Sequence, residues 1–203
     1  MKTLVGFTLI AVMLSSVLSC SKDDEIDVES HDKNRMMKEL HAMMDTMMAT
    51  PMPGDPDHHF AKMMQLHHKG AINMANIVLN HGKDTTIRMM AHDMIEKQTQ
   101  EIADLQSFLN SHEMHEANPE FNMKMEMSMD KMDRNADLQI INGDIDHDFA
   151  ILMIFHHQSA IEMADLVIHY GHHAEIAHMA ETMKEDQEME IMELQEWLLR
   201  HRN

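Results

Sequence analysis

The chain contains an internal repeat with an offset of 89 residues. Residues 67–75 read HHKGAINMA, and residues 156–164 read HHQSAIEMA. The same register extends without a gap on both sides of this motif, for example from Phe60 to Phe149. An ungapped match of this length indicates that one structural unit is duplicated, so the two halves are expected to fold alike and to bury a face against each other.

Each unit has the periodicity of a helical hairpin. Apolar residues recur at three- and four-residue steps over 60–78, and a second stripe of this kind follows over 84–110. Between them, Gly82 suits the left-handed position that commonly ends a helix. The second unit repeats the pattern over 146–201. The sequence therefore predicts an all-α protein, in which two repeated α-hairpins form a four-helix bundle.

Methionine-rich segments precede both hairpins. They predict additional short helices at 34–48 and 123–135, packed outside the bundle, while three prolines keep 51–56 as a loop. Residues 138–141 are the one strand-like stretch, and they could equally be a loop. The expected organisation is a first helical repeat over 34–112, a linker over 113–124 and a second helical repeat over 125–203.

The N-terminus has the features of an exported lipoprotein. Lys2 and an apolar run at 4–14 precede Cys20, which ends a Val-Leu-Ser-Cys sequence similar to a lipobox. Cys20 has no second cysteine to pair with, which favours lipidation over a disulfide. We therefore expect a lipoprotein signal peptide at 1–19, an acidic tether at 20–33, and a membrane-anchored protein of the bacterial envelope, facing the periplasm or the cell surface. The alternative is an ordinary secretory signal with an incidental cysteine.

Charge and composition restrict the function. The formal net charge of −19 argues against nucleic acid as a partner, because phosphate needs a basic surface. The chain also has 27 methionines and 18 histidines. Thioether and imidazole favour copper, as Cu(I) or Cu(II), and silver as Ag(I), over magnesium or calcium. Metal ions are therefore the expected partners, and no catalytic residues are predicted.

The repeated motif carries the candidate ligands. His67 and Met74 lie two helical turns apart on one face, and we expect His67 to pair within its own hairpin, so that it faces the same interior as Met94. A single histidine or methionine at such a position usually belongs to a core. A buried histidine nevertheless needs a polar partner, which could be a metal ion or the carboxylates of Glu101 and Glu190.

The predicted metal ligands are divided equally between the repeats: His67, His68, Met74 and Met94, and then His156, His157, Met163 and Met183. Auxiliary thioether ligands are expected at Met63, Met64, Met153, Met125, Met127 and Met129. The last three lie in a segment that we expect to be mobile, and it could instead bind a protein partner. Four further histidines are expected to face solvent or to make auxiliary Cu(II) or zinc contacts: His112, His115, His172 and His173.

The full pattern resembles a known family. Phe-Ala, His-His-x-x-Ala-Ile-x-Met-Ala, a glycine turn and Met-x-x-x-Gln-x-x-Glu-Ile look like the domain-of-unknown-function family 305, over roughly 36–112 and 125–201. That family includes CopM-type periplasmic copper-binding proteins and has a ferritin-like helical fold. The resemblance implies copper or silver binding linked to metal tolerance, by sequestering Cu(I) or delivering it to a copper-handling protein. Ser159 replaces Gly70, and Tyr170 replaces His81, so His81 is not a ligand common to both units.

Two other functions stay open. A di-iron oxidase needs Glu-x-x-His on two helices; Glu175 and His178 have this spacing, but their repeat counterparts are Thr86 and Met89. The other alternative is a metal-free surface lipoprotein that binds a protein through methionine-rich helices.

Overall fold

The computed structural model describes residues 28–201. Within this range the chain forms six α-helices and no strand: α1 (Arg35–Ala49), α2 (Pro56–His81), α3 (Thr85–Ser111), α4 (Pro119–Asp137), α5 (Ile145–Tyr170) and α6 (Ala174–Arg200). The predicted all-α helical bundle is thereby confirmed. The predicted signal peptide and Cys20 lie outside the described residues.

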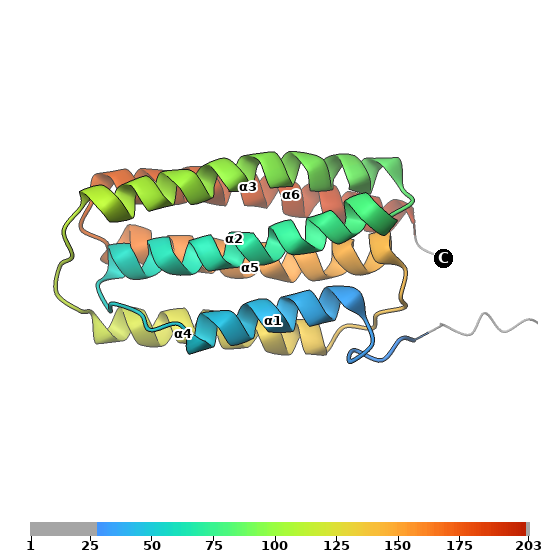
Figure 1. Cartoon of the computed structure of the whole chain (residues 1–203), viewed down its shortest axis with the longest axis horizontal. Helices are drawn as coiled ribbons and strands as arrows, with labels where there is room; N and C mark the ends of the chain where they lie inside the picture. The colour runs from blue at the N-terminus through green and yellow to red at the C-terminus, as the bar shows by residue number, and fades with distance from the viewer. Residues whose placement is uncertain (1–27, 202–203) are drawn as a thin grey trace, which may run out of the picture.

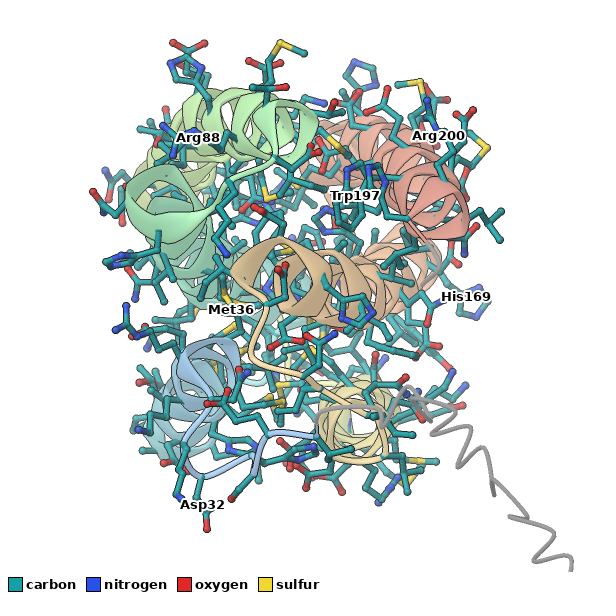
Figure 2. The ribbon with its side chains drawn as sticks, turned by 90° about the vertical axis from the view of Figure 1, so that its right-hand side faces the viewer. Asp32, Met36, Arg88, His169, Trp197 and Arg200 are labelled. Atoms are coloured by element: carbon teal, nitrogen blue, oxygen red, sulfur yellow. The ribbon has the colours of Figure 1, made fainter. Side chains whose placement is uncertain are left out.

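The six helices form three layers of two (Figures 1 and 2). α3 and α6 make one outer layer, α2 and α5 the middle layer, and α1 and α4 the other outer layer. α2 and α5 are therefore covered on two sides. The expected short helices outside a four-helix bundle are instead a complete third layer. Its helix α4 begins at Pro119, inside the predicted linker, because the Asn118 side chain accepts hydrogen bonds from the backbone N–H groups of Glu120 and Phe121.

The duplication is visible in the helix boundaries. α2 and α5 have 26 residues each, and α3 and α6 have 27 residues each. Both middle helices are capped by an aspartate, Asp55 and Asp144, whose side chains accept backbone N–H groups of the first turn. Equal local signals in the two halves thus produce hairpins of equal length.

Two buried aspartates tie each hairpin to the turn of the other. Asp146 accepts hydrogen bonds from the backbone N–H groups of Lys83 (2.7 Å) and Asp84 (2.9 Å). Asp57 does the same for the turn at 172–173, with distances of 2.9 and 3.3 Å. Such reciprocal contacts are those of two units related by an approximate two-fold axis. They leave the N–H groups of both turns satisfied inside the protein.

The glycines of these turns have a different role from the predicted one. Gly82 and Gly171 are not left-handed, with φ of −66° and −68°. A Cβ at Gly82 would instead collide with the Asp146 carboxylate, and a Cβ at Gly171 with that of Asp57. Glycine is required here because a carboxylate from the other hairpin approaches the backbone closely.

Gly82→Ala is expected to lower the free energy of unfolding by about 1–3 kcal/mol, the usual range for an overpacked site. The added methyl must displace the Asp146 carboxylate and with it the capping of the turn. Urea denaturation measures the difference. Lys83→Ala is the control, since it removes an exposed side chain but keeps the N–H group, and a change within about 0.5 kcal/mol is expected. Equal stability of the two variants would contradict this role of glycine.

The described end of the predicted acidic tether packs on the bundle. The N–H group of Glu29 donates to the carbonyl of Ile141 (2.9 Å), and the Asn34 amide donates to the Glu29 carboxylate (2.9 Å). The strand-like stretch at 138–141 is a loop, and it holds residues 28–33 in place.

α5 is the one helix among the described residues that is long and apolar enough to cross a membrane. More than half of its most apolar window, 56%, is buried inside the bundle. Its apolarity is accounted for by its position in the middle layer, where it contacts helices on both sides.

Candidate metal centre

Two histidine rings from different hairpins are in face-to-face contact, inclined by 34°, where α2 meets α5. The ring centroids of His67 and His156 are 3.5 Å apart, and both side chains are buried. Nε2 of His67 lies 2.9 Å from the Ser159 hydroxyl, and Nε2 of His156 donates to the carbonyl of His67 at 3.1 Å. The prediction that His67 pairs within its own hairpin is therefore wrong. The first histidine of each pair meets the other repeat, because α2 and α5 are neighbours in the middle layer.

The second histidine of each pair contacts its own hairpin. Nε2 of His68 lies 2.8 Å from a Glu101 carboxylate oxygen, and His157 has the same contact with Glu190. Burial alone would raise the pKa of Glu190, but the close contact with the His157 imidazole and the charge of Lys97 lower it overall. Of the two polar partners expected for a buried histidine, a metal ion or a glutamate, His68 and His157 thus have the glutamate.

The His67–His156 pair is neutral at pH 7. Burial, the largest cause, and neighbouring histidines lower the pKa of His67 and His156 well below 6.5. Each ring uses Nε2 in a hydrogen bond, and Nδ1 of each has no hydrogen-bond partner among residues 28–201. With Nε2 as the donor, Nδ1 carries the free lone pair. Leaving a buried nitrogen unpaired costs about 1–3 kcal/mol, so these two atoms are suited to an additional ligand.

A thioether lies beside this pair. The Ser159 hydroxyl, which contacts His67, is also 3.1 Å from Sδ of Met132. In the other repeat, Met43 packs against Gly70, where a Cβ would collide with its thioether. The sequence prediction did not include Met43 and Met132 among the ligands. Their signal was available, since the two methionines correspond in the repeat.

Most of the predicted ligands are interior residues. Those that are buried are His67, His68, Met74, Met94, His156, His157, Met163, Met183, Met63, Met64, Met153, Met125 and Met129. Met127 is 60% exposed. The expectation of a mobile segment is wrong for Met125 and Met129, because they lie on the face of the regular helix α4 that packs against the bundle.

The Glu-x-x-His motif lies on the surface. The side chain of His178 is 82% exposed, and its ring is 4.0 Å from the Glu181 carboxylate. This motif therefore does not contribute to the interior, where the carboxylates next to histidine are those of Glu101 and Glu190.

Within the described range, two groups of three nitrogen or oxygen ligand atoms lie within 4.8 Å of one another. One is Asp57, His115 and His172; the other is the exposed set His92, Asp93 and Glu96. The four central histidines are not among these groups. A metal ion at the His67–His156 contact would therefore need thioether sulfur to complete its ligands.

The four central histidines lie within a region that matches a known family. Residues 57–198 match the family described as Domain of unknown function (DUF305). The chain belongs to this family. The DUF305 match begins in the first turn of α2 and ends in α6, so it takes in both hairpins and α4. The predicted resemblance is confirmed. No curated protein matches the chain.

Two solved DUF305 structures have a similar fold. One is a protein from Streptomyces coelicolor that is described as secreted, with 23% identity, a TM-score of 0.57, and coverage of 72% of this chain and 92% of the other. The second is a fragment from Deinococcus radiodurans, with 23% identity, a TM-score of 0.54, and coverage of 74% and 99%. At this identity the similarity concerns the fold.

Proposed function

We propose that this DUF305 protein is an exported envelope protein that binds Cu(I) or Ag(I) at one centre shared by its two repeats. The observation that carries the proposal is the contact between His67 and His156, whose rings are neutral and whose Nδ1 atoms are buried without a partner in the described chain. The Met132 thioether, held near His67 through Ser159, supplies a soft third donor.

The chemistry of these donors suits a monovalent soft ion. Neutral imidazole and thioether add no negative charge, so a Cu(I) or Ag(I) complex would carry a charge of +1 inside the protein. The carboxylates of Glu101 and Glu190, which contact His68 and His157, provide compensating negative charge. Burial also restricts water, which favours Cu(I) over the more strongly hydrated divalent ions.

The proposal also includes export of the protein to the cell envelope. The apolar N-terminal segment and Cys20 favour lipid anchoring to an envelope membrane, and a protein of similar fold is described as secreted. In the envelope the protein would sequester Cu(I) or deliver it to a copper-handling partner. A single buried centre favours sequestration or transfer of one ion at a time.

Met132→Leu tests the thioether directly. Leucine nearly conserves the volume, so a loss of stability below about 1.5 kcal/mol is expected, while affinity for Cu(I) falls at least about tenfold. The measurement is an anaerobic Cu(I) titration of the full chain in detergent against a competing chelator. Met127→Leu is the matched control, because Met127 lies on the exposed face of the same helix and should leave affinity unchanged. A wild-type chain that binds neither Cu(I) nor Ag(I) would overturn the proposal.

A metal-free interaction protein is the second candidate. Large methionine side chains are exposed on the outer helices α3 and α6, at Met89, Met189 and Met192. Such side chains suit an adaptable surface for another protein. On this reading, adding Cu(I) or Ag(I) leaves the melting temperature unchanged, whereas binding at the central histidines raises it.

A further inference from the structure

We infer that a second metal site, for a borderline divalent cation such as Zn(II) or Cu(II), lies at the end of the bundle where α5 turns into α6. Its ligands are Asp57, His115 and His172, with His173 beside them. This is the left-hand end in Figure 1, where the connection from α3 to α4 passes the α5–α6 turn. The site is distinct from the central one and does not depend on it.

Three separate segments bring the ligand atoms together. Asp57 is in the first turn of α2, His115 in the connection at 112–118, and His172 in the turn before α6. One ligand atom from each lies within 4.8 Å of the others. A tetrahedral zinc ion with bonds near 2.1 Å separates its ligand atoms by roughly 3.4 Å. Asp57 is held by the backbone of the turn, and the two exposed imidazoles can rotate to close this difference.

His173 lies beside these three ligands, outside the group whose ligand atoms are within 4.8 Å of one another, and would turn toward them to serve as a fourth. Its ring centroid lies 4.9 Å from that of His115, and the rings of His115 and His172 are 4.5 Å apart. Nε2 of His173 is buried and has no hydrogen-bond partner in the described part of the chain. This unpaired nitrogen lies beside two exposed imidazoles and a fixed carboxylate. A divalent ion bound to these groups would satisfy it.

The local sequence at this turn departs from what helix stability favours. Each helix from α1 to α5 has a side-chain cap at its N-terminus, from Asn34, Asp55, Asp84, Asn118 or Asp144. At α6 the cap position is His173, which makes no such hydrogen bond. Its repeat counterpart, Asp84, accepts N–H groups at 2.8 and 3.0 Å. The histidine therefore forgoes about 1 kcal/mol of helix capping, and such departures are expected at functional positions.

The opposite end of the bundle has the same backbone arrangement without these imidazoles. Asp146 holds its turn as Asp57 does, but the turn residues are Lys83 and Asp84 instead of two histidines. The duplication thus supplies a natural reference for what the fold alone requires. Folding needs the aspartate and the glycine of the turn, and it does not need histidine.

His112 belongs to the fold and not to the metal site. Its ring stacks on Phe108, with centroids 4.3 Å apart. Its repeat counterpart, His201, stacks on Trp197 in the same way at 4.2 Å. Both accompany a helix C-terminus, so this histidine is explained by stacking at either end. The residues specific to one end are His115, His172 and His173.

The double variant His172→Lys/His173→Asp tests the site. It copies the turn of the other repeat, so the chain should fold, and the new aspartate should raise the melting temperature of the metal-free protein. Zn(II) affinity of the full chain in detergent, measured by competition with a chromogenic chelator, should fall at least about 100-fold, more than the 10–100-fold typical when a residue that only orients a ligand is lost. His115→Ala should weaken Zn(II) binding in the same way.

Two controls separate this site from others. His201→Ala changes the stacked histidine at the opposite end of the bundle, and His92→Ala removes a ligand of the exposed group on α3. Neither change should alter the tight Zn(II) affinity. Cu(I) affinity, measured on the double variant, reports on the central site independently. The inference is overturned if the double variant and His115→Ala bind Zn(II) as the wild type does, if His92→Ala removes the binding, or if the wild type does not bind Zn(II).

Discussion

Replacing either His67 or His156 by alanine should abolish the same tight Cu(I) site, so that each single variant loses all of it and not half. The centroids of the two rings are 3.5 Å apart, and the rings come from different hairpins. In the proposed centre, one ion at the edge of the pair uses Nδ1 of both rings, so neither hairpin alone has the complete set of ligands. Removing a ligand should weaken binding by more than about 100-fold, beyond the effect of losing a residue that only positions one.

An anaerobic Cu(I) titration of each variant against a competing chelator measures both stoichiometry and affinity. His67→Gln and His156→Gln are the polar variants to use if alanine lowers stability. His178→Ala is the control, since this histidine is exposed on α6 and should leave the tight site intact. If each single variant keeps half of the tight sites, the two repeats bind metal independently, and the shared centre is excluded.

The metal-free protein should lose stability steeply as the pH falls below about 6.5. His67 and His156 are neutral when folded, because burial lowers their pKa well below 6.5, whereas the unfolded chain takes up protons near its ordinary histidine pKa. These two histidines therefore cost no stability well above pH 6.5, where they are neutral in the folded and in the unfolded chain. Below it, each histidine removes about 1.4 kcal/mol per pH unit until the lowered folded pKa is reached, or about 3 kcal/mol per unit for both.

Chemical denaturation of chelator-treated protein between pH 7.5 and 5.5 measures this slope. In the double variant His67→Gln/His156→Gln, the decrease of the unfolding free energy per pH unit should be smaller by most of the roughly 3 kcal/mol that the two histidines contribute. Some slope will persist, because burial also lowers the pKa of His59, although the hydrogen bond that its Nδ1 donates to the Asn122 amide oxygen opposes the shift. An unchanged slope in the double variant would mean that the pair is already protonated or accessible in the folded protein.

The family and the secondary structure could be predicted from the sequence because both depend on local or linear patterns. Helical periodicity identified both hairpins, and the repeat related α2 to α5 and α3 to α6. One histidine of each pair and most of the predicted methionines were correctly identified as interior residues, since an apolar stripe indicates which side of a helix is buried. Periodicity also identified α4, although the cap at Asn118 starts it earlier than predicted.

Burial on one side of a helix does not identify the neighbour on that side. α2 and α5 are covered on two sides, and the adjacent residues His67 and His68 face different partners: His156 across the repeat, and Glu101 within it. Which histidine meets which partner depends on how the hairpins dock. The same is true of Gly82, whose backbone geometry is ordinary and whose role comes from the Asp146 carboxylate of the other hairpin.

The sequence by itself thus determined the helices, the duplication and the side chains that are buried, because these follow from hydrophobic period and capping within short segments. Only the tertiary structure decided that His67 and His156 of the two motifs are in contact, and that Asp57, His115 and His172 meet at one end of the bundle. Both arrangements join residues from segments that are distant in the chain. Their distances are set by packing of the three layers, which no local pattern encodes.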